Sequence, residues 1–319
     1  MNQRTPPQID TDALSIRETI IPRDQAEAAA AVRQASASRT AVYPIGGGTS
    51  LRYGLAAQQP GIALQLAELN RIVDYPARDM TITVEAGITM ATLTKTLATE
   101  RQRLPIDVPH DEQATLGGVI ATDWSGPRRY GFGTMRDYVI GIHAIDGRGT
   151  PFKGGGRVVK NVAGYDFCKL LTGSLGTLGV ITQVTLKVKP IAERTAWLAC
   201  SAKDFEQAEM LLAALVHSQT TPVAIELVSG PAWQTSELLP RTSDAVATLL
   251  VGLEGTTPEV EWMVEQLGRE WHEQGIAETH EIPGEQIAKL ESQLNAFSAA
   301  SDAQLVVKAN LLPSKVTAF

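Results

Sequence analysis

Short stretches that alternate apolar and polar residues, separated by helical stretches, make up the first 190 residues of the chain. The alternation has the period of two that half-buried strands show, and short, mostly apolar runs are typical of buried strands. We expect strands over residues 41–45, 62–66, 69–75, 81–87, 137–146 and 179–189. Helices are predicted over 25–34 and 90–101, with Asp24 and Thr89 as N-caps, and Asp146-Gly147-Arg148-Gly149 is predicted to form a hairpin turn. Strands mixed with helices in this order predict an α+β domain.

From about residue 192 the pattern changes to a more regular order of longer elements. We expect strands at 196–201, 224–229, 245–253, 276–282 and 304–311, and helices at 204–218, 258–274 and 285–297. This order of strand, helix, strand, strand, helix, strand, with one extra helix, resembles a ferredoxin-like antiparallel sandwich.

The same pattern gives the domain boundaries. Residues 1–19 are expected to form an arm, 20–192 a first domain with subdomains of about 20–78 and 79–192, and 193–319 a smaller second domain. Pro313-Ser314-Lys315 resembles the start of another helix, so we expect the second domain to be incomplete at its C-terminus.

Composition narrows the class of protein. A hydrophobic content of 44% and a charged content of 20% are ordinary for a globular protein, and a net charge of −7 argues against a nucleic-acid binder. The two cysteines, Cys168 and Cys200, lack C-x-x-C spacing, which favours a reducing cytoplasm. No apolar run approaches the roughly 18 residues of a membrane span, so membrane association is expected only through a partner.

The candidate chemistry lies in three turns that combine glycines with hydroxyl residues. Gly46-Gly47-Gly48-Thr49-Ser50 follows a strand, and its N–H groups can form a nest for an anion. It lacks the lysine of a Walker A loop and the spacing of a Rossmann loop, and a turn without ligand remains an alternative. The turns 115–118 and 173–179 repeat the same chemistry. Three such turns predict a long ligand with a pyrophosphate, a ribityl chain and a ring system.

The segments PIGGGTSL, ATLGGVIAT, SGPRRYGFGTMRDYVIG and RVVKNVAGYDFCKLLTGSLGTLGVITQVTLKVKP carry a resemblance to a known family. Residues 20–190 resemble the FAD-binding domain of the vanillyl-alcohol-oxidase/PCMH flavoprotein superfamily, in the branch of glycolate oxidase and D-lactate dehydrogenase subunits. SGPRRYGFGTMRD is similar to the smaller FAD-binding E subunit of bacterial glycolate oxidases. The resemblance implies a PCMH-type FAD-binding domain of two α/β subdomains, followed by a ferredoxin-like cap domain.

The resemblance also implies the residues that bind FAD. They are Gly46, Gly47, Gly48, Thr49, Ser50, Thr115, Gly117, Gly118, Thr122, Ser125, Arg136, Gly164, Tyr165, Gly176, Gly179, Val180 and Ile181. Members with covalent flavin have histidine where this chain has Thr49, so FAD is expected to be noncovalent. Ile45 stands where the family usually has arginine, which removes one polar contact.

Candidates for the catalytic side are fewer. Oxidation of a 2-hydroxy acid needs a proton acceptor and a cation for the carboxylate. We expect His110 to handle the proton and Arg129 or Lys160 to supply charge. For Lys160 the alternative is a surface lysine with no role in the site. Arg128 and Arg129 are either a substrate-binding pair or a solvated or partner-facing pair. His143 is interpreted as a core residue, and no metal site is predicted.

Three functions remain open from the sequence. The first is the FAD-binding subunit of a glycolate oxidase complex, in which a catalytic flavin subunit and an iron–sulfur subunit are the partners. The second is a free-standing FAD-dependent 2-hydroxy-acid dehydrogenase of the D-lactate type. The third is a scaffold without flavin, which the intact glycine turns disfavour because an empty site leaves N–H groups unpaired.

Overall fold

The computed structural model describes residues 14–53, 57–157, 164–234, 236–239, 245–297 and 307. The chain forms two compact units. The first contains the chain up to Ser125 and then Thr134–Ile191, and the second contains Gly126–Gly133 and the chain from Ala192 on. The chain therefore passes between the units three times. The strand predicted over 304–311 lies outside the described residues, apart from the single residue Val307.

The first sheet of the first unit contains three parallel strands. Its order is β1-β3-β2, formed by Ile16–Ile20, Gly61–Gln65 and Ala41–Ile45. β1 falls within the predicted N-terminal arm, so that prediction is wrong for residues 16–19. Only the two ends of β1 are partly shielded from solvent, so the strand lacks the alternation that marks a half-buried strand.

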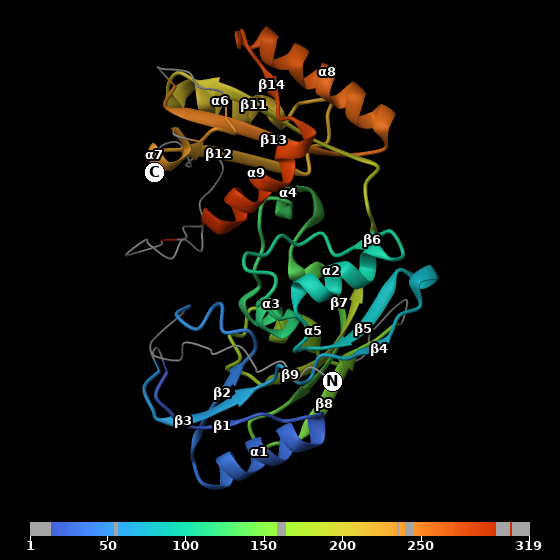
Figure 1. Cartoon of the computed structure of the whole chain (residues 1–319), viewed down its shortest axis with the longest axis vertical. Helices are drawn as coiled ribbons and strands as arrows, with labels where there is room; N and C mark the ends of the chain where they lie inside the picture. Colours follow the sequence, from blue (N-terminus) through green and yellow to red (C-terminus); the bar gives the residue numbers. More distant parts are fainter. Residues whose placement is uncertain are drawn as a thin grey trace. The chain divides into compact units, whose positions relative to one another are not determined.

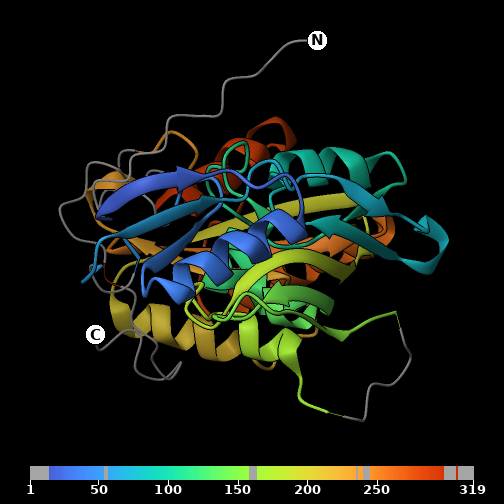
Figure 2. The same ribbon diagram turned by 90° about the horizontal axis from the view of Figure 1, so that it is seen from below.

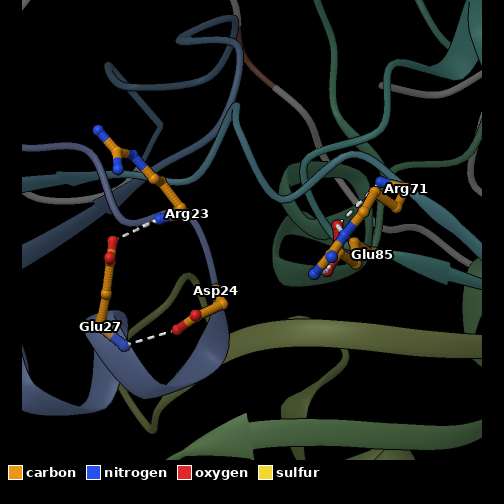
Figure 3. A network of polar contacts seen from close by, with 5 residues as sticks. All are labelled: Arg23, Asp24, Glu27, Arg71 and Glu85. Atoms are coloured by element: carbon orange, nitrogen blue, oxygen red, sulfur yellow. Dashed lines mark hydrogen bonds and ion pairs between the residues drawn. The ribbon is translucent and has the colours of Figure 1, made fainter.

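Helix α1 (Gln25–Ala37) connects β1 to β2 and begins at the predicted N-cap. The Asp24 carboxylate accepts a hydrogen bond of 2.8 Å from the backbone N–H of Glu27. The Glu27 carboxylate in turn accepts one of 2.9 Å from the backbone N–H of Arg23 (Figure 3). These two bonds satisfy N–H groups that a helix start leaves free, and they confirm the predicted cap.

The second sheet of this unit is antiparallel and has five strands. Its order is β4-β5-β9-β7-β8, formed by Ile72–Asp74, Thr81–Glu85, Val180–Lys187, Val139–Ile145 and Pro151–Gly155. β7 and β8 form the predicted hairpin, whose turn is closed by a hydrogen bond of 3.0 Å from Gly149 N to Asp146 O. The other elements of the unit are η1 (Ala77–Asp79), α2 (Met90–Ala98), β6 (Gln102–Arg103), α3 (Leu116–Thr122), η2 (Met135–Asp137), α5 (Phe167–Leu171) and β10 (Lys189–Pro190).

α1 packs against both sheets. Its inner face consists mainly of alanines, which contact Leu64 and Leu66 from the first sheet and Ile145 and Val180 from the second. Figure 2 shows α1 running between strands of the two sheets. Small side chains let the helix approach both surfaces closely, so α1 fixes the two sheets relative to each other within the unit.

A charge pair fastens the end of β5, where the chain turns toward α2 and α3. The guanidinium of Arg71 contacts the carboxylate of Glu85 at 2.7 Å, and the Arg71 N–H donates to the same carboxylate at 2.9 Å (Figure 3). The hydrogen bond to Glu85 and its negative charge raise the pKa of Arg71. Two residues on, Gly87 passes so close to the Leu66 carbonyl that a Cβ would overlap it. The ion pair between Arg71 and Glu85 therefore holds the end of β5 beside the segment that follows β3.

The second unit is a four-stranded antiparallel sheet covered on both faces. Its order is β12-β13-β11-β14, formed by Ala224–Ser229, Ala247–Gly255, Arg194–Ala202 and His280–Glu281. The helices of the unit are α4 (Arg129–Phe132), α6 (Phe205–Leu215), α7 (Pro231–Gln234), α8 (Thr257–Glu273) and α9 (Gly284–Phe297). α6 and α8 cover one face, and α7 and α9 pack on the other, as Figure 1 shows for α8 and α9.

Candidate functional site

The first two glycine turns lie directly against each other in the first unit. A Cβ on Gly46 would overlap the Thr115 hydroxyl, and a Cβ on Gly47 would overlap the carbonyl oxygen of Gln113. Thr115 is also the N-cap of α3, accepting a hydrogen bond of 3.4 Å from Gly118 N. Only glycine permits this approach, so the sequence places Gly46 and Gly47 where two loops of a single site must meet.

The third turn joins the same region. Gly173 N donates to Ile120 O at 2.9 Å and Leu175 N donates to Ala121 O at 2.7 Å, which ties the turn to the last residues of α3. Gly176, with a φ of 72°, lies against Pro44, two residues before the first glycine turn. The structure thus brings together the three turns that were singled out from sequence.

A cavity of about 230 Å³ opens between α1, β2 and the third turn. Its walls are mainly apolar, and hydroxyl and carboxyl groups stand among them. The lining residues are Val32, Ser36, Thr40, Val42, Pro44, Ile145, Asp146, Gly147, Gly176, Thr177, Leu178, Gly179 and Val180. A small, largely apolar cavity with a few polar groups suits a flat heteroaromatic ring. Of these lining residues, Gly176, Gly179 and Val180 are among the cofactor-binding residues expected from sequence.

Asp146 is a site residue that the sequence did not reveal, because its position in the hairpin turn already explained it. Its Oδ1 accepts hydrogen bonds from Thr150 N at 2.8 Å and Arg148 N at 2.9 Å. These backbone hydrogen bonds, that from Thr150 first, hold the pKa of Asp146 below its usual value. The carboxylate is therefore ionised at the edge of the cavity, where it can accept a hydrogen bond from a ligand hydroxyl.

Three buried oxygens near the end of α3 and the third turn also matter. Asp123 Oδ1, Ser125 Oγ and Ser174 Oγ have no hydrogen-bond partner among the described residues. Asp123 and Leu175 both have left-handed backbones, with φ of 48° and 53°. Buried polar atoms nearly always have partners, so these oxygens fit a site that a polar ligand completes. Ser125 is one of the predicted cofactor residues and Ser174 belongs to the third predicted turn, whereas Asp123 was not among the predicted residues.

The other predicted cofactor residues are spread around these turns. Thr49 is exposed after the first turn, and Thr122 Oγ1 donates within its own helix to Gly118 O at 2.9 Å. Arg136 is exposed on η2, Ile181 is buried in β9, and the ring of Tyr165 follows Gly164 and is 85% exposed. Their roles stay predictions.

The predicted catalytic residues belong to different parts of the chain. His110 is exposed in the turn before α3, with a φ of 54°, and its carbonyl accepts hydrogen bonds from Gln113 N and Ala114 N. Arg129 is exposed on α4, which belongs to the second unit. Lys160 lies outside the described residues.

Arg128 corrects one expectation. It was interpreted as a ligand for an acidic substrate or as a solvated or partner-facing residue, and it is neither. Its Nε lies 2.6 Å from Glu254 Oε1 and its Nη2 lies 2.6 Å from Glu291 Oε1, and its side chain is only 13% exposed. The guanidinium is occupied by two carboxylates of its own unit.

His143 is half-buried in β7, opposite Lys153 of β8. Burial first, and the charge of Lys153 second, lower its pKa. This environment keeps the imidazole neutral near pH 7, in keeping with a structural residue. Across the described ranges, no group of three or more His, Cys, Asp or Glu side chains is placed to hold a metal ion. Nor does any described helix have the length and apolar character that crossing a membrane requires.

Comparison with known proteins identifies the ligand of the first unit. Residues 17–155 match the family described as FAD binding domain. The glycolate oxidase subunit GlcD of Bacillus subtilis is 26% identical over 300 residues, 93% of this chain and 63% of that protein. The glycolate oxidase subunit GlcE of Escherichia coli is 43% identical over 120 residues, 37% of this chain and 34% of that protein.

Among solved structures, alkyldihydroxyacetonephosphate synthase superposes with a TM-score of 0.70 at 20% identity, covering 88% of this chain and 56% of that one. This likeness shows a shared mixed α/β fold. The chain spans less than two thirds of the length of each of these relatives. Residues 17–155 thus match an FAD-binding domain, and the expectation of FAD as the cofactor is confirmed.

Proposed function

We propose that this chain is the FAD-binding subunit of an oxidoreductase complex that oxidises 2-hydroxy acids such as glycolate to 2-oxo acids. A catalytic flavin subunit and an iron–sulfur subunit would be its partners. The observation that carries the proposal is the convergence of three glycine turns and a small apolar cavity in the first unit, whose residues 17–155 match FAD-binding domains. The two glycolate oxidase subunits among its relatives support the substrate class.

In this proposal, residues of the first unit would bind several parts of FAD. The cavity beside Gly176, Gly179 and Val180 would take the adenine ring, and the Asp146 carboxylate would accept from a ribose hydroxyl. The N–H groups of the first turn and the turn of Thr115 would bind the pyrophosphate. The oxygens of Asp123, Ser125 and Ser174 would contact the remaining polar groups. When bound, the flavin supplies the acceptor for the hydride of the substrate carbon.

The protein's own residues would bind the substrate and handle its proton. In this proposal His110 accepts the hydroxyl proton and Arg129 or Lys160 binds the carboxylate. Both described candidates, His110 and Arg129, are solvent-exposed, and among the described residues neither side chain has a hydrogen bond or an ion pair. Exposure of both groups favours a subunit that is completed by a partner over a free-standing dehydrogenase, because oriented catalytic groups are normally held by their surroundings.

The second unit is proposed as the cap domain. Its element order β11-α6-β12-α7-β13-α8-β14, in which α7 is a short insertion, and its strand order β12-β13-β11-β14 support the ferredoxin-like connectivity expected from sequence. We infer that FAD is bound noncovalently, because Thr49 stands where covalent members have the histidine that bonds to the flavin.

The first experiment uses the full chain, purified and titrated with FAD. We expect a yellow protein that releases intact FAD on heating, and no bleaching by glycolate or D-lactate under anaerobic conditions without partners. A chain that binds no FAD would contradict the proposal. Bleaching by the chain alone would instead establish a free-standing dehydrogenase. Purification from the native host, with flavin and iron measured, tests the partners.

A matched pair of variants tests the position of the adenine ring. Ser36 is exposed on α1 and lines the cavity, whereas Gln34 is exposed on the same helix and does not line it. Ser36→Phe should fill the cavity mouth and weaken FAD binding at least tenfold, while Gln34→Phe should leave the dissociation constant within twofold. Equal constants for both variants would show that FAD does not use this cavity.

A further inference from the structure

We propose that a cavity in the second unit binds the arginine side chain of a partner polypeptide, with Trp262 stacking on the guanidinium and Glu259 neutralising its charge. All the residues that line this cavity belong to the second unit. Binding at this cavity is therefore separate from the FAD site, and it does not require the flavin.

The cavity lies between the N-terminal half of α8 and the segment that leads into β12. Its volume is about 480 Å³, and its lining residues are Thr221, Glu254, Pro258, Glu259, Trp262 and Met263. Met263 is buried, and its sulfur accepts a hydrogen bond of 3.5 Å from the Thr221 hydroxyl. This contact joins the two sides of the cavity, so its base is fixed. A volume of this size is in the range of ligand pockets.

Trp262 forms the aromatic wall of the cavity. It is 45% exposed, whereas Trp271 of the same helix is buried in the core with Val260, Met263 and Leu267. The packing of α8 on the sheet therefore does not depend on Trp262. Indole is the aromatic group that attracts cations most strongly, and tryptophan and arginine are both enriched among the residues that dominate protein interfaces. Trp262 is thus placed to contact a cation that enters the cavity.

Two carboxylates line the cavity, and they differ in their pairing. Glu254 Oε1 lies 2.6 Å from Arg128 Nε, so a cation already neutralises it. Glu259 Oε2 accepts hydrogen bonds from the Thr256 hydroxyl at 2.7 Å and from the Thr256 N–H at 2.9 Å, and within the described ranges no cation pairs with it. The hydroxyl first, and the N–H second, lower the pKa of Glu259. Glu259 therefore presents a negative charge that a ligand can neutralise.

The arrangement favours a cation over an anion. Glu259 and Trp262 lie three residues apart on α8, so their side chains are neighbours on the helix surface. A cation between them would meet a carboxylate on one side and an aromatic ring on the other. The N–H groups at the start of α8, which attract anions, already have carboxylate acceptors, since Glu193 accepts from Thr257 N at 3.3 Å and Glu259 from Thr256 N.

The form of the cavity favours an arginine side chain that a partner polypeptide carries. A guanidinium is planar, stacks on aromatic rings and is more weakly hydrated than an ammonium group. Sites for free small molecules bury most of the ligand, whereas this cavity leaves the indole of Trp262 half exposed. A partner surface that presents the arginine would cover that exposed indole as well.

The test follows Trp262 by fluorine NMR in the full chain labelled with 5-fluorotryptophan, and the variant Trp262→Phe assigns its signal. The probes are a capped glycine–arginine–glycine peptide and the same peptide with citrulline, which resembles arginine in shape but has no charge. We expect the arginine peptide to shift the Trp262 signal saturably and to bind about fivefold more tightly than the citrulline peptide. Equal affinities, or a Trp262 signal that does not move, would overturn the inference.

A matched pair of variants tests the carboxylate. Glu259→Gln removes the charge but keeps a residue that can form the capping box with Thr256, so α8 should stay intact. It should weaken binding of the arginine peptide about threefold. Glu265 is exposed on the same helix and does not line the cavity, so Glu265→Gln should leave the affinity within error of the wild type. Equal weakening by both variants would show only a general attraction to an acidic surface.

Two further probes distinguish other occupants of the cavity. Guanidinium chloride that shifts the Trp262 signal at the same concentrations as the arginine peptide would indicate a site for a free small cation. A capped glycine–leucine–glycine peptide that binds more tightly than the arginine peptide would indicate an apolar occupant. Either result would overturn the assignment to an arginine of a partner. A chain that binds the arginine peptide but no FAD would contradict the proposed function alone.

Discussion

At the scale of single residues, the candidate site depends on atoms that are absent as much as on atoms that are present. Gly46 and Gly47 leave room for Thr115 and for the Gln113 carbonyl, so two loops from different parts of the chain meet backbone to backbone. Gly118, in the same site, has more space, because a Cβ there would lie 3.4 Å from the Thr115 hydroxyl. The glycines of one motif therefore differ in what they would tolerate.

This difference gives a prediction for the protein without FAD. Gly47→Ala should lower the free energy of unfolding by about 3 kcal/mol, because the methyl group overlaps a backbone carbonyl that cannot rotate away. Gly118→Ala should leave stability unchanged or raise it by about 0.5 kcal/mol, because alanine favours the helix. Denaturant unfolding of both variants measures the contrast. Equal stability of the two would show that the first two turns are not in contact.

At the scale of elements, α1 has a larger role than its position near the start of the chain suggests. It connects two strands of one sheet, packs against the other sheet, and forms one wall of the cavity. Its start is fixed by the hydrogen bond from Glu27 N to Asp24. Loss of this helix cap should therefore lower the stability of the whole first unit.

Asp24→Ala tests this connection. Loss of the cap should reduce the free energy of unfolding by about 1 kcal/mol, because one N–H at the helix start loses its acceptor. Arg23→Ala is the control, since Arg23 contributes its backbone N–H to Glu27 and alanine keeps that donor. Chemical denaturation monitored by circular dichroism would compare them. A loss as large in Arg23→Ala would show that the cap is not the cause.

At the scale of the whole molecule, each of the two units contains one buried cysteine whose reactivity can report the opening of that unit. Cys168 lies in α5 of the first unit and Cys200 in β11 of the second, and both are buried. Burial, with a smaller effect of Asp166, raises the pKa of Cys168 to about 11, and burial raises that of Cys200 to about 12. Since the thiolate is the reactive form, each cysteine should react only when its own unit opens.

We therefore expect thiol labelling at pH 8 to be slow at both cysteines and to report the two units separately. FAD at a hundredfold excess over its dissociation constant should slow the labelling of Cys168 by about a hundredfold if that opening releases the ligand. Peptide mass spectrometry distinguishes the two sites, and labelling in denaturant gives the reference rate. Labelling of either cysteine at the reference rate in the native protein would contradict the burial on which this prediction rests.

The local features of this protein were determined by sequence alone. The caps Asp24 and Thr89, the hairpin turn at Asp146, and the strand at 224–229 depend on neighbours within a few residues, and the structure confirms each. The three glycine turns were recognised for the same reason, because a turn that needs glycine shows it in its own sequence. The resemblance to FAD-binding domains rested on the sequence segments that contain those turns.

Only the tertiary structure decided how distant segments combine. The partners of Arg128 are 126 and 163 residues away in sequence, and its contacts leave no local pattern that could distinguish it from its exposed neighbour Arg129. The cavity is likewise built from α1, β2 and a turn near residue 177, so Ser36 and Asp146 gained their place in the site only through packing. Local hydrogen bonds and backbone angles are encoded in adjacent residues, whereas a shared cavity or a buried ion cluster exists only once the chain has closed on itself.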